Sequence, residues 1–223
     1  AQPLPKGKRV AIITNTGGHG VISADGCVEA GLLVPPLPEN TREALKNGLF
    51  PEAATENPVD VLATATPVHY GLALRELMKD GGTDSILVNF ITPFFVDCEG
   101  VAREIVKACA GKEKTVAAVI MTDKAQQAKT LQIIKESGIP VYDFPETAAK
   151  VLGAMAKLSE YRGRDKETSE PLPDVDKKAA RAAVNAALEK KRTILDAREC
   201  ARVLDSYGIP RAPAETCRNL QEC

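Results

Sequence analysis

The feature that most constrains the fold of this chain is a regular alternation of short apolar runs and helical patterns between residues 8 and 162. The apolar runs predict strands at residues 10–13, 32–34, 85–91, 116–121 and 139–142. Helical patterns separate these runs, and with one exception the connections are short. Strands that alternate with helices favour a parallel sheet with helices on both faces. We therefore expect a doubly wound α/β domain with five parallel strands over residues 1–162.

Five strands with their helices in this length are typical of the flavodoxin-like arrangement. After this domain the composition becomes polar and interrupted by proline, which predicts a linker over residues 163–176. Residues 177–223 follow as a short helical tail, with an Ala-rich helix at 177–190 and a second helix that a capping box at Asp196 and Glu199 begins. The tail is too short for a domain of its own. Either it packs back on the first domain, or the chain is a fragment of a longer protein.

Composition narrows the classes of function. The net charge of −1 and the 4% of aromatic residues, with no Trp, argue against a nucleic-acid-binding surface. No apolar run approaches the roughly 20 residues that span a bilayer, and the first nine residues lack the apolar core of a signal peptide. We therefore expect a cytoplasmic protein with neither a nucleic-acid nor a membrane partner.

A metal site is not expected either. The six cysteines never approach Cys-x-x-Cys spacing, and His19 and His69 are the chain's two histidines. Cys27 and Cys109 fall within helical patterns and are interpreted as small buried side chains that stay reduced.

The strongest functional signal is a glycine-rich turn that joins the first strand to a helix. Gly17, Gly18 and Gly20 remove the side chains that would keep a ligand away from the backbone amides. A helix start offers free N–H groups and a partial positive charge, which suit a phosphate or a carboxylate. We predict a phosphate-binding site at Thr16, Gly17, Gly18, His19 and Gly20. The last four would supply backbone donors, and Thr16, Asn15 and Ser23 would supply side-chain contacts.

Other interpretations of the turn remain open. No lysine follows the glycines, which argues against a Walker A loop. Gly18, Gly20 and Ser23 match the dinucleotide pattern in part, and Glu39 lies at a suitable distance for a ribose contact, but it follows a proline-rich stretch. The glycines could also form a tight turn that binds nothing.

Ligands of doubly wound sheets gather at the carboxyl ends of the strands. Thr92 and Pro93 end the most apolar strand at this edge, and we expect them to line the same site as the glycine turn. The long connection over residues 50–67 contains Asn57 and Asp60, which are further candidates. For Asp60, a hydrogen bond that orders the loop is an equal alternative. His69 is interpreted as a surface or capping residue.

Four segments, in this order, resemble the NDP-forming acyl-CoA synthetases, the ADP-forming acetate–CoA ligases related to succinyl-CoA synthetase. They are residues 9–25 (RVAIITNTGGHGVISAD), 57–60 (NPVD), 87–93 (LVNFITP) and 137–145 (SGIPVYDFP). Residues 195–210 (LDARECARVLDSYGIP) are similar to the opening helix of the family's ATP-grasp domain, so residues 177–223 would be the incomplete start of that domain.

The resemblance implies a reversible conversion of acyl-CoA, ADP and phosphate to acid, CoA and ATP through a phosphohistidine. It assigns the helix after the glycine turn a role in stabilising the phosphoryl group. It also implies that ATP or ADP, Mg²⁺ and CoA bind to other domains, so we expect no cofactor bound by this chain itself. The implied partners are the CoA-binding and phosphohistidine domains and the ATP-grasp domain of the same protein. A homodimer is compatible with it too.

His19 departs from the family pattern, in which a small residue or proline stands at this position. The phosphorylated histidine of the family lies in a Ser-His-Thr-Gly context, which is absent from this chain. We therefore expect no catalytic residue in it, and we interpret His19 as a local substitution that forms a hydrogen bond or faces solvent. Two other functions stay open: a regulatory synthetase-like module of a protein acetyltransferase, and a free flavodoxin-like protein that binds FMN.

Overall fold

The computed structural model describes residues 2–111, 113–163, 175–214, 217 and 219 of the 223-residue chain. It forms two compact units, Ala1–Asp165 and Lys166–Cys223. Most of the predicted linker, residues 163–176, and most of residues 215–223 lie outside the described residues.

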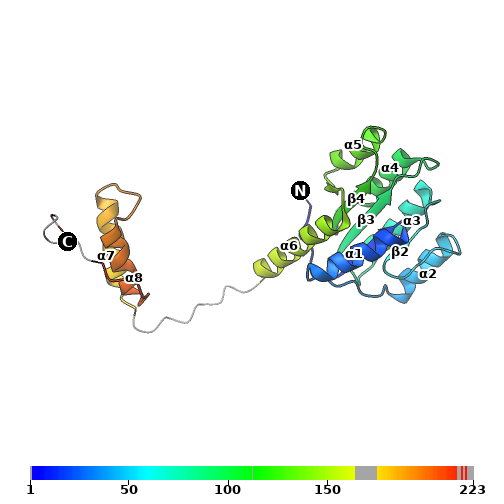
Figure 1. Ribbon diagram of the computed structural model, residues 1–223. Coiled ribbons are helices and arrows are strands. Elements are labelled where there is room, and N and C mark those ends of the chain that lie inside the picture. The colour runs from blue at the N-terminus through cyan, green and yellow to red at the C-terminus, as the bar shows by residue number, and fades with distance from the viewer. Residues whose placement is uncertain (1, 112, 164–174, 215–216, 218, 220–223) are drawn as a thin grey trace. The chain divides into compact units, whose positions relative to one another are not determined.

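The first unit contains one sheet of five parallel strands (Figure 1). The strands lie in the order β2-β1-β3-β4-β5, and every neighbouring pair is parallel. This order is that of flavodoxin-like sheets, so the predicted fold class is confirmed. The strands are β1 (Val10–Thr14), β2 (Val59–Asp60), β3 (Ser85–Ile91), β4 (Thr115–Met121) and β5 (Val141–Tyr142).

Six helices of this unit cover the two faces of the sheet. Helices α1 and α6 pack on one face, and buried residues of α2 to α5 pack on the other. The bounds of these helices are α1 (Gly17–Glu29), α2 (Glu39–Gly48), α3 (Pro67–Lys79), α4 (Cys98–Ala108), α5 (Ala128–Glu136) and α6 (Pro145–Gly163). Each of α1, α3, α4, α5 and α6 begins just after a strand, so their amino ends gather at the carboxyl edge of the sheet.

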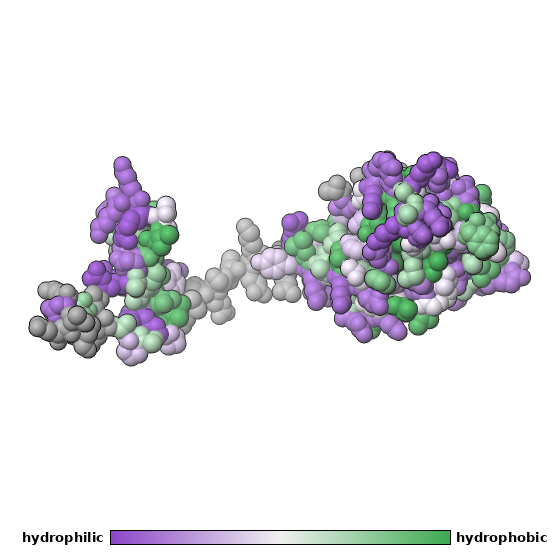
Figure 2. Space-filling view, turned by 45° about the horizontal axis from the view of Figure 1, so that its top comes forward, coloured by the Kyte–Doolittle hydropathy of each residue, from purple (hydrophilic) through white to green (hydrophobic). Residues whose placement is uncertain are grey.

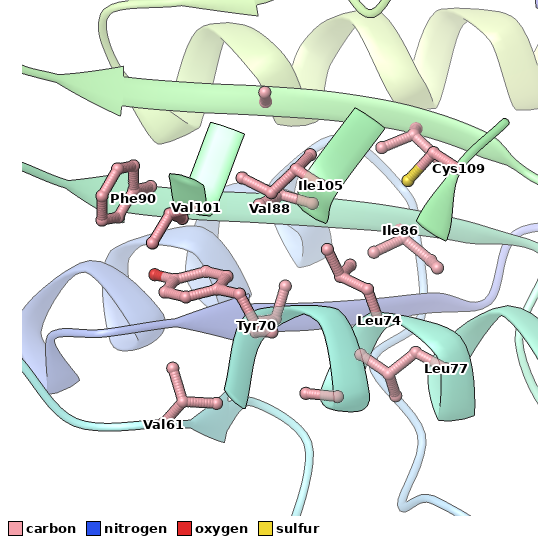
Figure 3. Close-up of a cluster of buried hydrophobic side chains, with 14 of the residues drawn as sticks. Val61, Tyr70, Leu74, Leu77, Ile86, Val88, Phe90, Val101, Ile105 and Cys109 are labelled. Atoms are coloured by element: carbon pink, nitrogen blue, oxygen red, sulfur yellow. The ribbon is translucent and has the colours of Figure 1, made fainter. Parts of the chain in front are cut away.

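The larger core cluster lies between β3 and the helices α3 and α4 (Figure 3). Tyr70 and Leu74 of α3 and Ile105 of α4 are fully buried against it, and Val88 and Phe90 belong to β3. Full burial of one such side chain contributes about 1.5–3 kcal/mol. The packing of α3 and α4 on β3 therefore holds in place the strand at whose carboxyl end the candidate site begins.

The prediction of the second strand is wrong. Residues 32–34 form no strand, because Leu33 makes a single parallel bridge with Arg9 before two prolines redirect the chain. The observed strand is Val59–Asp60, which pairs with Ile13 and Thr14 and lies in the segment predicted as a long connection. The number of strands was therefore right, and the position of one was not.

The side chain of Asn57 occupies the edge of β1 between these two pairings. Its Oδ1 accepts a hydrogen bond from the backbone N–H of Ile12 at 2.9 Å. Its Nδ2 donates to the backbone carbonyls of Val10 at 2.8 Å and Pro35 at 2.9 Å. A side-chain amide thus pairs with β1 where a longer strand would otherwise lie.

The second unit contains a pair of helices, α7 (Lys177–Glu189) and α8 (Ala197–Ser206). The predicted capping box is confirmed, since Asp196 accepts from the Glu199 N–H and Glu199 accepts from the Asp196 N–H, both at 2.9 Å. The pair buries mainly alanines, and Leu188 and Ile194 remain exposed. Figure 2 shows hydrophobic and hydrophilic residues side by side on the surface of this unit. Such a small core does not account for an independent domain.

Candidate functional site

The glycine-rich turn is the first turn of α1. The helix begins at Gly17, four residues before the apolar pattern at Val21 indicates a start. Its N-cap, Thr16, has an extended backbone with φ −154° and ψ 117°, but the Thr16 side chain makes no capping hydrogen bond. The hydroxyl of Thr14 maintains this conformation, since it accepts from the Thr16 N–H at 3.1 Å and donates to the Thr16 carbonyl at 2.9 Å.

Three backbone donors at this helix end lack a partner among the described residues. They are the amides of Gly17, Gly18 and His19, which precede the first intrahelical bond. The Gly20 amide was also predicted as a donor, but it already donates to the Thr16 carbonyl at 3.2 Å. The first turn contains no acidic residue. The helix end therefore offers three N–H groups and the positive end of its dipole to an external anion.

The glycines of this turn have different surroundings. A Cβ at Gly20 would lie 3.2 Å from Cγ2 of Thr14 and 3.5 Å from Cβ of Pro58, so close packing explains this glycine. Around a Cβ at Gly18 there is nothing within 4 Å, and both Gly17 and Gly18 are exposed. Neither has a positive φ. The internal structure of the chain therefore does not require Gly18, although glycine costs about 1 kcal/mol relative to Ala inside a helix.

Asn15 joins the glycine turn to the end of β3. Its side chain is buried, donates to the Ile91 carbonyl at 2.8 Å and accepts from the Ile91 N–H at 3.0 Å. The loop of Thr92 and Pro93 therefore begins beside the residue that precedes the N-cap of α1. The Thr92 hydroxyl in turn forms a 2.6 Å hydrogen bond with the hydroxyl of Thr122, which follows β4.

The carboxylate of Asp60, the last residue of β2, lies close to Gly17 at the start of α1. Its Oδ2 would be 3.5 Å from a Cβ at Gly17, and its Oδ1 accepts from the Leu62 N–H at 2.9 Å. Leu62 has φ 72°, a left-handed conformation that is rare for this residue type. Burial raises the pKa of the Tyr70 hydroxyl well above its ordinary value, and the Asp60 carboxylate raises it further. Tyr70 therefore stays neutral and donates to the Asn89 carbonyl at 3.0 Å.

Besides Asn15, two further predicted site residues, Ser23 and Asn57, form hydrogen bonds inside the fold. The Ser23 hydroxyl is buried and forms hydrogen bonds of 3.2 and 3.0 Å with the side-chain amide of Asn89. Asn57 bonds to β1 and Pro35, as described above.

The predicted site residues therefore form two groups. Gly17 and Gly18 are exposed and offer backbone N–H groups, whereas the side chains of Asn15 and Ser23 are buried and support the turn. Sequence reasoning missed the supporting roles of Thr14, Asn89 and Thr122. Thr14 and Asn89 lie within the family-like segments 9–25 and 87–93, but no local pattern indicates their hydrogen bonds.

The two histidines differ in their environment. His19 is the third residue of α1 and is partly exposed. Nδ1 of His69 accepts from the Thr66 N–H at 3.1 Å and lies 2.8 Å from the Thr66 hydroxyl. Thr66 and His69 form a capping box at the amino end of α3. The His69 ring stacks on Phe50 with centroids 4.2 Å apart. The prediction of a capping role for His69 is confirmed.

The cysteines predicted as buried side chains are buried. Burial raises the pKa of the Cys27 thiol to about 11 and that of Cys109 to about 12, so both stay protonated at neutral pH. Across the described ranges, no three His, Cys, Asp or Glu side chains gather in a way that could hold a metal ion. None of the helices in those ranges combines the length and the apolar character needed to cross a membrane.

Comparison with known proteins connects this geometry to one family. Residues 10–164 match the model of the Ligase-CoA domain. The chain is 35% identical over 168 residues to the alpha subunit of acetate–CoA ligase [ADP-forming] II of Pyrococcus furiosus, a match that covers 73% of this chain and 36% of that protein. It is 28% identical over 222 residues to acetate–CoA ligase [ADP-forming] I of Archaeoglobus fulgidus, which covers 97% and 30%. The chain thus spans about a third of the length of these relatives.

Solved structures give the same result. A crystal structure of a Pyrococcus horikoshii protein has a TM-score of 0.69 and 34% identity, over 73% of this chain and 38% of that one. The dinucleotide-forming acetyl-coenzyme A synthetase 1 of Ca. Korarchaeum cryptofilum, in complex with phosphate and ADP, has a TM-score of 0.65 and 26% identity, over 72% and 35%. The expected resemblance is confirmed, and the chain belongs to the Ligase-CoA domain family.

Proposed function

We propose that residues 2–163 belong to an ADP-forming acyl-CoA synthetase and stabilise its phosphoryl group in transit. One observation carries the proposal: α1 presents three unpartnered amides, with no capping side chain among the described residues, at the carboxyl edge of the sheet. The relatives that this part of the chain matches are ADP-forming acetate–CoA ligases. The reaction would convert acyl-CoA, ADP and phosphate to acid, CoA and ATP, in either direction.

The chain's own contribution would be electrostatic. The amides of Gly17, Gly18 and His19 would donate to the oxygens of a phosphoryl group that a histidine of another domain carries. Fixed N–H donors stabilise that charge without a proton transfer and with little reorganisation. A helix end of this kind contributes about 0.3–1 kcal/mol where exposed and up to about 2 kcal/mol where partly buried. The Thr16 hydroxyl, Asp60, Thr92 and Pro93 would line the same site.

Other parts of the protein would supply the remaining chemistry. We propose that CoA and the phosphorylated histidine belong to a preceding region, and that ATP or ADP and Mg²⁺ bind to an ATP-grasp domain that begins with α7 and α8. The match to the Archaeoglobus relative, which covers 97% of this chain, supports the placement of the helical pair in one protein with residues 2–163. The exposed Leu188 and Ile194 support a larger surrounding domain. We place the protein in the cytoplasm, where free thiols stay reduced.

A matched pair of variants in the full-length protein tests the role of the amides. Gly17→Pro deletes one N–H, and the helix should tolerate it, because Pro is favoured at the first helical position and the extended Thr16 backbone suits a residue before proline. Gly17→Ala keeps the N–H, and its Cβ would lie 3.5 Å from the Asp60 carboxylate. We expect the proline variant to slow single-turnover phosphoryl transfer about fivefold to thirtyfold relative to the alanine variant.

Equal transfer rates in the two variants, at equal thermal stability, would contradict the assigned role of the amides. A wild-type full-length protein that forms neither a labelled phosphoenzyme from ATP nor ATP from acyl-CoA, ADP and phosphate would contradict the proposed activity as a whole.

A further inference from the structure

The Asp60 carboxylate lies beside the amides at the start of α1, and the proposed function gives it no chemical task. A Cβ at Gly17 would lie 3.5 Å from Oδ2 of Asp60. An anion bound to the Gly17 amide would therefore lie close to a full negative charge. Two like charges about 5 Å apart near a protein surface repel each other enough to weaken binding severalfold. A site that attracts anions thus contains a group that repels them.

Hydrogen bonds on both sides hold Asp60 in this place. Its backbone N–H donates to the Ala54 carbonyl at 2.9 Å, and its carbonyl accepts from the Ala54 N–H at 3.1 Å. The N–H of the next residue, Val61, donates to the Thr14 carbonyl at 2.9 Å. The Leu62 N–H donates to Oδ1 of the carboxylate. The backbone and one carboxylate oxygen are therefore held, and these bonds fix where Oδ2 lies relative to the start of α1.

No described residue neutralises the Asp60 charge. Among the described residues, Oδ2 has no hydrogen-bond partner and Asp60 forms no ion pair. The loops after β1 and β2, residues 15–16 and 61–66, contain no lysine or arginine, and neither do the first turns of α1 and α3. Lys124, which follows β4, forms a 2.8 Å ion pair with Asp143. The negative charge beside the amides is therefore uncompensated in the described part of the chain.

The internal structure of the chain does not require this charge. An asparagine side chain would accept the same hydrogen bond from the Leu62 N–H, because its carbonyl oxygen replaces Oδ1. Asp60 makes no hydrogen bond to the amides of Gly17, Gly18 or His19, so it is not their cap. The charge therefore acts on any anion that approaches these amides.

We infer that Asp60 sets the charge selectivity of the α1 amides and keeps free dianions, such as inorganic phosphate, from occupying them. This inference rests on the proposed function, in which inorganic phosphate is a reactant and is present with the enzyme. Repulsion grows with the charge of the ligand, so the free-energy penalty for a dianion is about twice that for a monoanion. A phosphoryl group tethered to the same protein overcomes the penalty through its high effective concentration. Asp60 is thus a specificity residue and takes no part in making or breaking bonds.

Two tetrahedral anions of different charge test this selectivity in the 223-residue chain. Sulfate is a dianion and methanesulfonate is a monoanion, and both present oxygens to N–H donors. NMR shifts of the amides of residues 17–19 measure both affinities at constant ionic strength, because screening changes with salt. We expect Asp60→Asn to raise the affinity for methanesulfonate about threefold and that for sulfate about tenfold. A purely structural role for Asp60 would not make the effect depend on the charge of the ligand.

Asp25→Asn is the matched control, because it removes the same charge from the same helix. Asp25 is exposed and lies about 12 Å from Gly17 along the helix axis, which exceeds the screening length of about 8 Å at physiological ionic strength. The affinities for both anions should stay at their wild-type values. Thermal melting verifies that both variants fold.

The full-length protein provides a second readout. Sulfate should inhibit single-turnover phosphoryl transfer weakly in the wild type, and Asp60→Asn should lower the sulfate concentration for half-inhibition about tenfold. Asp25→Asn should leave this concentration unchanged.

The possible failures differ in what they overturn. An unchanged ratio of sulfate to methanesulfonate affinity in Asp60→Asn would refute the selectivity role and leave the proposed function intact. A weaker affinity for sulfate in this variant would also refute it, because Asp60 would then support anion binding. If neither anion shifts the amides of residues 17–19 in either protein, the anion site is absent, and the proposed function fails together with the inference.

Discussion

The amino ends of α1 and α4 lie at the same edge of the sheet, after neighbouring strands, but their unpaired amides are treated in opposite ways. In α4 the Asp97 carboxylate accepts from the Gly100 N–H at 2.8 Å, and Glu99 adds a negative charge to the first turn. In α1 the N-cap side chain makes no such bond and the first turn has no acid. One helix end thus has an internal cap and an acid in its first turn, and the other has neither.

Gly100 in the first turn of α4 and Gly18 in the first turn of α1 also differ in the space around them. A Cβ at Gly100 would lie 2.2 Å from Oδ2 of Asp97 and 2.7 Å from Cγ of Pro67, whereas a Cβ at Gly18 would meet nothing within 4 Å. The first glycine makes room for its own cap. The second has open space around it, which the proposed function assigns to the phosphoryl group. Steric need therefore explains Gly100 but does not explain Gly18.

The largest expected effect is that of Gly100→Ala. The new Cβ would displace the Asp97 carboxylate and press on the rigid ring of Pro67. Loss of the cap and overpacking together should lower the free energy of unfolding by about 2–3 kcal/mol. Urea denaturation followed by circular dichroism measures this. A loss below about 0.5 kcal/mol would show that the two helix ends have the same steric freedom.

Removal of the cap alone should have a smaller effect. Asp97→Ala leaves the Gly100 amide without its acceptor and should cost about 1 kcal/mol in the same denaturation experiment. Thr16→Ala is the matched control, since Thr16 occupies the same position in α1 but makes no capping bond. Similar losses for the two variants would contradict the contrast between the helix ends.

Gly18→Ala should change stability in the opposite direction. An exposed glycine inside a helix costs backbone entropy, and the added Cβ has free space around it. We expect the unfolding free energy of the 223-residue chain to rise by about 0.5–1 kcal/mol. The same variant should slow phosphoryl transfer in the full-length protein, where the site would be occupied. A gain in stability without any loss of transfer would indicate that Gly18 has no role in ligand access.

The smallest expected effect is that of inorganic phosphate on this chain alone. Weak binding to three amides should stabilise it by a few tenths of a kcal/mol at most, even at tens of millimolar. The selective readout is NMR, in which the amides of residues 17–19 should shift with phosphate while those of residues 98–100 do not. Equal shifts at both helix ends would indicate a general salt effect.

Sequence patterns predicted the fold well where elements are long and apolar. β3 and β4 are seven-residue buried strands, and both were expected. The second strand was misplaced because Val59–Asp60 is too short to carry a periodicity, whereas residues 32–34 are apolar for a different reason. Leu32 is buried in the smaller core cluster without belonging to a strand. In a segment of three residues, an apolar run can indicate either burial alone or a buried strand, and the sequence does not distinguish the two.

The candidate site was predictable to the extent that it consists of backbone. The glycine turn and its position after β1 follow from local sequence. The hydrogen bonds of Asn15 with Ile91 and of Ser23 with Asn89 join residues far apart in the chain. No local pattern distinguishes a buried asparagine that bonds to the backbone from one that faces a ligand. The division of the site residues into donors and supports therefore required the tertiary structure.

The asparagine side chains at β1 have a consequence for how this sheet ends. A side-chain amide carries the same donor and acceptor as a peptide group. Asn15 bonds to Ile91 from one side of the chain, and Asn57 bonds to Ile12 and Val10 from a neighbouring segment. Each asparagine side chain therefore adds a hydrogen-bonded pair to the sheet in the place of a strand residue. The main chain of β1 can leave the sheet early and turn at once into α1, while its neighbour stays tied in register.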